Sequence, residues 1–395
     1  MKKIFSLVAM ATLMVAGMAS CSNEDADNQA SVQNGNMIGF TANTNIVPSS
    51  RGYALNASNV GATLPNFQTW AYDAEDGGLY MGVSATEGRT VNNADENTDG
   101  VFENAWSYTP VQFWPVNALN FVAIAPATPN GVTGNSVAQD GTSKDITLTT
   151  AVTLSTNVEE QDDIMFAEAD GIEKTTSGAN VPYTFKHALS QIVFKGQLPT
   201  SGTITKVSIA EITLGNVPKT GNLVFDNNGD FFGGTALAPV AQITASTPAN
   251  FTLDAGDLEK AVWDVNAAEN PAVAGTPFDL TISNNADKKN AWMLLPQTVT
   301  AWTPADASEL KAGGKAEAPT TGAYLKIRAQ LEKDGVVVLE DTDPIYIPLS
   351  ISWDRSKKYI YTIEFNGTSA LTPITFSVAA ENWTDADPQP GQLDM

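Results

Sequence analysis

The sequence predicts an all-β protein made of β-sandwiches, with few and short helices. Stretches of alternating apolar and polar residues recur along the chain, turn-forming residues separate them, and helical patterning is scarce. Gly and Pro are frequent, with 30 and 21 residues among 395. Many short strands without regularly intervening helices are typical of sandwiches and not of a parallel sheet flanked by helices.

The clearest strand signal covers residues 324–331, where apolar residues fall at every second position from Leu325 to Leu331. A period of two residues indicates a strand with one buried face. Similar or apolar segments occur at residues 37–41, 119–125, 146–148, 181–195, 207–214, 345–349, 359–365 and 374–378. Turn-forming residues lie at 126–134, 227–229 and 333–335. Two short helices are expected, at 254–265 and 306–312, and neither is long enough to organise a fold.

The first residues have the layout of a secretory signal peptide. Lys2 and Lys3 precede an uncharged apolar run at 4–17, and small residues lead into Cys21. The run is shorter than the roughly 20 residues that cross a bilayer, so we expect residues 1–20 to be removed. Cys21 is the single cysteine of the chain and ends a segment that resembles a bacterial lipobox. This pattern predicts that the thiol carries lipid. Two or three acyl chains would give stable membrane attachment.

Residues 21–36 are polar and predict a disordered tether. Their acidic cluster, residues 24–27, resembles the surface-export signal of Bacteroidetes lipoproteins. The formal net charge of −23 becomes −23 − 2 = −25 without residues 1–20, which contain two lysines and no acids. Such a surface repels nucleic acid and favours solubility, so nucleic-acid binding is excluded.

The chain is longer than one ordinary domain, and two are expected. The best boundary is the polar stretch at 170–180, rich in Gly, Ser and Thr. We therefore expect an N-terminal sandwich at 37–178, a C-terminal sandwich at 179–385 and a flexible tail at 386–395.

Catalytic chemistry finds little support in the sequence. His187 is the single histidine, lies beside a strand segment and is expected to be structural; no cysteine follows Cys21. The acidic pairs at 159–160 and 162–163 are interpreted as solvated loop, and no pair of carboxylates stands out for acid–base work. No enzyme activity, cofactor or catalytic residue is predicted.

Three binding or processing signals are weaker. Residues 95–100 fit the first half of a calcium loop, but Trp106 stands at position twelve where a glutamate is needed, so a weak calcium site stays only an alternative. Trp114 and Trp353 flank strands, as core anchors or as sugar-stacking platforms. Arg51 lies in a loop with Ser, Pro and Gly after the first strand signal, where a chain is exposed and cleavable.

Several motifs occur together in a characteristic order. They are the lipobox, IGFTA at 38–42, FWP at 113–115, DIMFA at 163–167, FKHALS at 185–190, MLLPQ at 293–297 and the closing strand at 359–365. Together they resemble the fimbrillin (Mfa-like) proteins, which are type V pilins and related fimbrial subunits of Bacteroides and Porphyromonas.

The resemblance implies two transthyretin-like Greek-key β-sandwiches in tandem and export as an outer-membrane lipoprotein. It also implies maturation by an arginine-specific protease, with Arg51 at the matching position. Cleavage there would release the strand that contains Met37, Ile38 and Phe40 and would leave a groove. In the family the groove is usually filled by the C-terminal segment of another subunit; the candidate residues here are Ile374, Phe376, Val378 and Trp383.

The implied role is a structural subunit of surface fimbriae that assembles head-to-tail with other fimbrial subunits. A head-to-tail contact builds a filament and not a closed dimer, and an added strand supplies main-chain hydrogen bonds. A tip or anchor subunit, or a solitary surface lipoprotein that binds a host or dietary glycan, stays an alternative on sequence alone.

Overall fold

The computed structural model describes residues 37–44, 49–50, 53–54, 64–94, 105–174, 180–200, 204–226, 241–242, 248–281, 290–365 and 375–382. Within these ranges the chain is strand apart from loops and two short 3-10 helices, η1 (Val158–Glu160) and η2 (Ala307–Leu310). The predicted all-β fold class is confirmed. Across the same ranges, no helix has the length and apolar character needed to cross a membrane.

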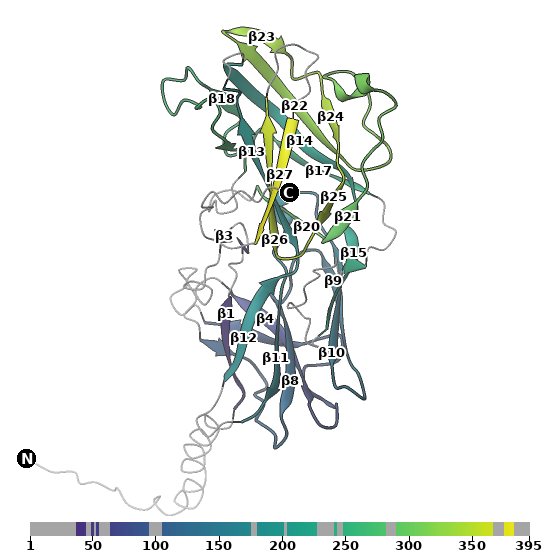
Figure 1. Cartoon of the computed structure of the whole chain (residues 1–395). Helices are drawn as coiled ribbons and strands as arrows, with labels where there is room; N and C mark the ends of the chain where they lie inside the picture. Colours follow the sequence, from purple (N-terminus) through teal and green to yellow (C-terminus); the bar gives the residue numbers. More distant parts are fainter. Residues whose placement is uncertain are drawn as a thin grey trace, which may run out of the picture.

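The first sheet holds eight strands and lies in the lower half of Figure 1. Its order is β1-β12-β11-β8-β4-β6-β7, with β5 paired to β4. The strands are β1 (Gly39–Thr44), β4 (Asn66–Asp73), β5 (Leu79–Met81), β6 (Arg89–Asn93), β7 (Trp106–Ser107), β8 (Leu119–Ala125), β11 (Met165–Ile172) and β12 (Asn180–His187). The second sheet faces it with the order β16-β15-β10-β9. Its strands are β9 (Val132–Gln139), β10 (Ile146–Thr153), β15 (Thr220–Asp226) and β16 (Ala241–Gln242).

Two further sheets form the upper half (Figure 1). The third has the order β19-β13-β26-β27 with β20 on β13, and comprises β13 (Ser190–Gln197), β19 (Phe278–Asp279), β20 (Trp292–Leu294), β26 (Lys357–Glu364) and β27 (Thr375–Asn382). The fourth has the order β17-β14-β22-β23, with β18 on β14 and β24 on β22. It comprises β14 (Lys206–Val217), β17 (Ala249–Asp254), β18 (Val262–Asp264), β22 (Tyr324–Lys333), β23 (Val336–Leu339) and β24 (Ile345–Pro348). Two small ladders pair β2 (Ser49–Ser50) with β3 (Tyr53–Ala54) and β21 (Gln297–Val299) with β25 (Ile351–Trp353).

The alternating patterns set the faces of the strands. In β22 the apolar residues from Leu325 to Leu331 are buried, while the polar residues between them are half-buried. The turn after β22 uses Asp334 and Gly335, both with positive φ (50° and 82°), which suits a tight hairpin into β23. Pairing with β14 across most of its length then makes β22 a central strand of the fourth sheet.

Apolar residues form two large buried clusters, one on each face of the first sheet. One cluster lies between the first and second sheets, where Phe166 stacks on Phe225, and it continues without a break into the upper half. The other is enclosed by the first sheet itself, because the sheet curls until β1 and β7, at opposite ends of the strand order, contact each other. A curled sheet can cover one of its own faces in this way.

Hydrogen bonding crosses the expected boundary between residues 178 and 179. β12 pairs with β1 and β11, so it belongs to the first sheet. β15, still later in the chain, pairs with β10 of the second sheet. The sheets therefore do not divide between residues 178 and 179. That the segments at 37–178 and 179–385 are independent domains stays a prediction.

Neither predicted helix forms as expected. Residues 254–265 make a turn, and then Val262–Asp264 pair with β14 as β18, so the helix predicted there is wrong; sheet pairing outweighs the local pattern. In 306–312 only the short η2 forms, begun by the Asp306 side chain, which accepts a hydrogen bond from the Ser308 amide.

Candidate functional site

The candidate site is the position of β1 in the first sheet. β1 lies parallel to β12 along six residue pairs, from Gly39 opposite Asn180 to Thr44 opposite Phe185. On its other side the Ile38 amide donates to the Gln112 carbonyl at 3.0 Å, and Met37 bridges to Phe113. The segment at 37–44 therefore pairs with β12 along one side and, at its first two residues, contacts residues 112–113 on the other, where it closes the curled sheet.

Every second side chain of this segment points into the enclosed cluster. Ile38, Phe40 and Ala42 are 0%, 4% and 1% exposed, whereas Gly39 and Thr41 are half-buried on the outer side. The period of two, seen in the motif at 38–42, is what aims these three residues inward. We call the space that they fill, between β12 and residues 106–113, the β1 slot.

Phe40 is the anchor of the segment. Its ring stacks on Tyr183 of β12 at 5.7 Å and 11°, and meets Phe67 and Tyr108 edge-on at 5.5 and 5.6 Å between centroids. Phe121 contacts it from the floor of the slot at 6.4 Å. Aromatic pairs in these geometries contribute about 0.5–1.5 kcal/mol each beyond the apolar area that they bury.

Tyr108 holds the segment from the side of the slot that residues 106–113 form. Its hydroxyl donates to the Ile38 carbonyl at 2.8 Å, and burial raises the pKa of Tyr108 to about 12, so it stays protonated as a donor. Tyr183 in the opposite wall is fully buried, and burial raises its pKa further still. The slot can thus hold a strand by main-chain bonds on both sides and by ring contacts below.

The structure places the residues of the expected site as follows. Met37, Ile38 and Phe40 lie together at β1, in the first sheet. Phe376 and Val378 lie in β27, which is the outermost strand of the third sheet and pairs with β26. Cys21, Arg51, Ile374, Trp383 and the calcium candidate at 95–100 lie outside the described residues. Ser50 and Tyr53, which flank Arg51 and Gly52 in the sequence, pair with each other.

The sequence did not identify the second wall of the slot. Tyr108 and Gln112 contact the segment at 37–42 across about 70 residues of chain, and no local pattern marks such a contact. Ala42 could have been found, because it continues the alternation of Ile38 and Phe40.

Four of the candidate residues for catalysis or sugar binding are buried: Asp163, His187, Trp114 and Trp353. Nδ1 of His187 lies 2.6 Å from Oδ2 of Asp163, and both side chains are fully buried, so the interpretation of Asp163 as solvated loop was wrong. Trp114 is 8% exposed against Phe121, and the buried Trp353 donates its indole N–H to the Tyr361 hydroxyl at 3.0 Å. Among the described residues, no three His, Cys, Asp or Glu side chains gather as a metal site.

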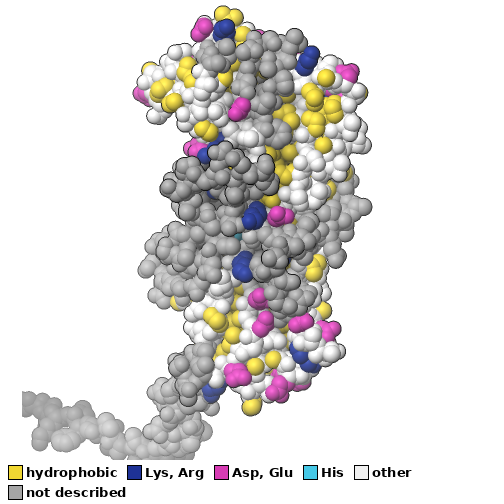
Figure 2. All heavy atoms as spheres, in the orientation of Figure 1, with side chains coloured by type: hydrophobic (Ala, Val, Ile, Leu, Met, Phe, Trp, Pro, Cys, Tyr) yellow, Lys and Arg dark blue, Asp and Glu magenta, His cyan; other side chains and the backbone are white. Residues whose placement is uncertain are grey.

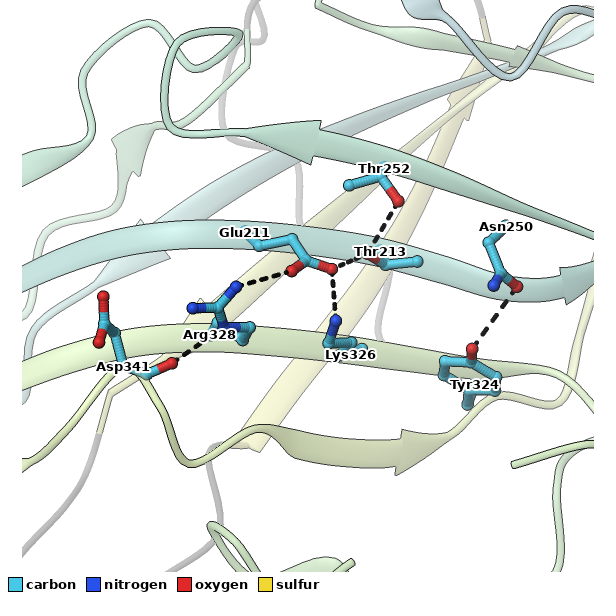
Figure 3. Close-up of polar contacts among 8 residues, drawn as sticks. All are labelled: Glu211, Thr213, Asn250, Thr252, Tyr324, Lys326, Arg328 and Asp341. Carbon is cyan, nitrogen blue, oxygen red and sulfur yellow. Dashed lines mark hydrogen bonds and ion pairs between the residues drawn. The ribbon is translucent and has the colours of Figure 1, made fainter. Parts of the chain in front are cut away.

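A cluster of polar side chains lies on the outer face of the fourth sheet (Figure 3). Glu211 of β14 accepts from Lys326 at 2.6 Å and from Arg328 at 3.3 Å, both on β22, and from Thr213 at 2.6 Å. Tyr324 points toward Asn250 of β17 (Figure 3). Because the carboxylate of Glu211 is engaged on both oxygens by its own sheet, this cluster ties strands together.

Acidic side chains, in magenta, gather over the lower half of the face in Figure 2. This distribution agrees with the strongly negative formal charge of −23.

Comparisons with known proteins place these observations in a family. The family profile described as fimbrillin-like matches residues 68–383. The fimbrium subunit Fim1C of Phocaeicola vulgatus is 26% identical over 220 residues, which cover 53% of this chain and 55% of that protein. The chain thus matches about half the length of this curated relative. The crystal structure of a fimbrial protein from Bacteroides vulgatus has the same fold, with a TM-score of 0.50, 16% identity and coverage of 88% of this chain and all of that one.

Proposed function

Because the chain belongs to the fimbrillin-like family, we propose that it is a structural, non-catalytic subunit of a surface fimbrium and assembles with other fimbrial subunits by strand exchange at the β1 slot. The observation that carries the proposal is the position of β1. This strand comes from near the start of the chain and pairs with β12, which lies much later in the sequence. All of β1 precedes Arg51 in the sequence. One cut after Arg51 separates the whole strand from the remainder of the protein.

The precursor reaches the cell surface as a lipoprotein in this proposal. The signal-like residues 1–20 are removed, and Cys21 carries lipid that attaches the chain to the outer membrane. Residues 22–36, with their acidic cluster, connect the lipid to β1.

Cleavage by an arginine-specific protease then converts the precursor into a form ready to assemble. Four arginines occur in the chain. Arg89 and Arg328 lie within β6 and β22, and Arg355 is 7% exposed, so their backbones are held in sheets or buried. Proteases prefer exposed loops, which favours Arg51, because its sequence segment is rich in Ser, Pro and Gly.

Loss of β1 exposes an apolar slot and the free edge of β12. The slot loses Ile38, Phe40 and Ala42, and β12 loses the partner of six residue pairs. An exposed sheet edge next to apolar side chains is a template for a strand from another chain. The candidate donor is the C-terminal segment of a neighbouring subunit, with Ile374, Phe376, Val378 and Trp383.

Treatment of the full chain with an arginine-specific protease tests the proposal. We expect cleavage after Arg51, followed by a ladder of oligomers that resists SDS without boiling and collapses to one band on boiling. The Arg51→Ala variant, treated in the same way, should stay uncut and monomeric. Cleavage of the native chain without any ladder would contradict assembly at this slot.

Lipid attachment is tested separately by labelling cells with radioactive palmitate. The native protein should carry the label and sediment with outer membranes, while Cys21→Ala should carry none. Label on Cys21→Ala would show that the lipid is held elsewhere.

A further inference from the structure

Two segments near opposite ends of the chain carry the same pattern of side chains. Residues 38–42 read Ile-Gly-Phe-Thr-Ala, and residues 374–378 read Ile-Thr-Phe-Ser-Val. Ile and Phe separated by one residue occur five times, starting at residues 38, 164, 192, 363 and 374. Only the first and last of these continue with a hydroxyl residue and then an aliphatic one. The second segment therefore copies the chemistry of the strand that fills the β1 slot.

We infer that the β1 slot accepts residues 374–382 of a second copy of this chain in one fixed register, parallel to β12. Ile374 takes the place of Ile38, Phe376 that of Phe40 and Val378 that of Ala42. The inference rests on the proposed function and adds to it the identity of the partner, a like subunit, and the residue pairs that form.

The site of Phe40 decides the register. It is bounded by the rings of Tyr183, Phe67, Tyr108 and Phe121. A shift of two residues puts Ile374 or Val378 there, which loses the ring contacts and leaves part of a close-packed site unfilled. A shift of one residue turns Thr375 and Ser377 inward and the apolar residues outward. Phe376 alone offers a ring at an inward position of this segment.

The outward positions also match, with one adjustment. Ser377 replaces Thr41 with the same hydroxyl group, and Ala379 replaces Asn43. Thr375 replaces Gly39, where a Cβ would clash with the side-chain oxygen of Asn180. Asn180 is exposed, so its side chain can rotate away. The tightest fit is at Ala42, because Val378 brings two additional carbon atoms into a site that is 1% exposed.

β27 is suited to leave its own sheet. It is the outermost strand of the third sheet, and β26 is its one neighbour among the described strands. Ser377 and Ala379 are exposed, whereas Val378 packs on the core of the upper half. Val378, which the inferred register turns into the slot, thus already packs on the core in β27, while its neighbours Ser377 and Ala379 face outward in both places.

Cysteine cross-linking tests the register, because Cys21 is the single native cysteine. In the inferred register Ala379 lies opposite Thr184, as Asn43 does in β1. The full chain with Cys21→Ser, Thr184→Cys and Ala379→Cys is cut with an arginine-specific protease, left to assemble and oxidised. We expect a ladder that survives boiling in SDS without reductant and collapses to a single band when reduced.

Two matched variants report the alternative registers. Thr184→Cys with Ser377→Cys and Thr184→Cys with Glu381→Cys place the thiols opposite each other only after a shift of two residues, about 6.6 Å along a strand. Disulfides need Cα atoms within about 7 Å, so both should give at least tenfold less cross-linked ladder. An equal or stronger ladder from either variant overturns the register.

The remaining outcomes separate this inference from the proposed function. If the Cys21→Ser parent forms no SDS-resistant ladder after cleavage, assembly at the slot fails and the register fails with it. If the parent forms a ladder but Thr184→Cys with Ala379→Cys is not cross-linked, strand exchange stands and the register is wrong. A cross-linked species with the mass of one chain means that the slot accepts the segment of its own chain, which overturns a second copy as the partner.

Discussion

Glu211 illustrates how single charged residues hold the outer face of the fourth sheet. Burial disfavours the charged carboxylate, but hydrogen bonds from Lys326, Thr213 and Arg328 and the charge of Lys326 outweigh it, so the pKa of Glu211 lies below its ordinary value of 4.5. A lowered carboxyl pKa stabilises the folded state at a pH above the unfolded pKa, and this contribution is lost as the pH falls through the folded pKa.

Glu211→Gln is therefore expected to destabilise the protein at pH 7, by about 1 kcal/mol. The difference from the native protein should shrink as the pH falls below 4.5, because protonation removes the same charge from the native side chain. Urea unfolding at pH 7 and pH 3 measures both effects. The exposed Glu317→Gln is the control and should change little at either pH. An equal loss at both pH values would argue against the ion pairs as the cause.

Between strands, Gly215 and Tyr324 show why a glycine stands near the C-terminal end of β14. The two residues pair across β14 and β22, and the ring of Tyr324 lies where a Cβ on residue 215 would be. The ring covers the glycine backbone, an arrangement that compensates for the weak strand propensity of glycine.

Gly215→Ala should destabilise the protein by about 1–3 kcal/mol, because the added methyl forces the ring of Tyr324 out of place. The loss should be smaller when Tyr324 is replaced by Leu in the same chain. Thermal or urea unfolding of the single and double variants measures the coupling. Gly134→Ala in β9, where an added Cβ meets no neighbour within 4 Å, is the matched control. Equal losses at the two glycines would exclude the clash.

Strand existence could be predicted from the sequence, but strand partners could not. The alternation in 324–331 fixes which face of β22 is buried, and the apolar segment at 119–125 forms β8, which is buried on both faces; both strands lie where expected. The same local pattern does not reveal that β15 leaves the upper half to pair with β10. It also does not reveal that residues 262–264 form the strand β18 in place of the predicted helix, because pairing with the neighbouring strand β14 determines their structure.

The candidate site was predictable to a similar extent. The motif at 38–42 contains the three inward side chains of the slot, whereas the wall at 106–113 is distant in sequence and carries no periodic signal. The inward direction of Asp163 was missed because a run of acidic residues is usually solvated, and its partner His187 lies 24 residues later.

Across the whole molecule, the two halves are joined by shared core and by buried hydrogen bonds. One apolar cluster contains residues of all four large sheets. Gln161 accepts from the Met293 amide at 2.7 Å and donates to the Ser155 carbonyl at 2.8 Å, and Ser356 donates to the His187 carbonyl at 2.6 Å. Two halves that share buried contacts of this kind stabilise each other.

We therefore expect the chain to unfold in one cooperative transition. Scanning calorimetry should give a single peak with similar calorimetric and van't Hoff enthalpies. Gln161→Ala should move this peak to lower temperature without splitting it, because the variant weakens a contact that both halves share. Two separate peaks in the native protein would contradict the shared core and favour independent domains.

The direction of β1 has a mechanical consequence. β1 and β12 run the same way for six residue pairs, and the chain enters β1 from Met37. Tension on the entering chain acts along the strand axis, so it strains the whole row of backbone bonds in shear at once. A sideways force would open them one after another. The protein pulled by the chain that enters β1 should therefore withstand far greater force than one in which the pairing of β1 with β12 is opened by a force across the strands.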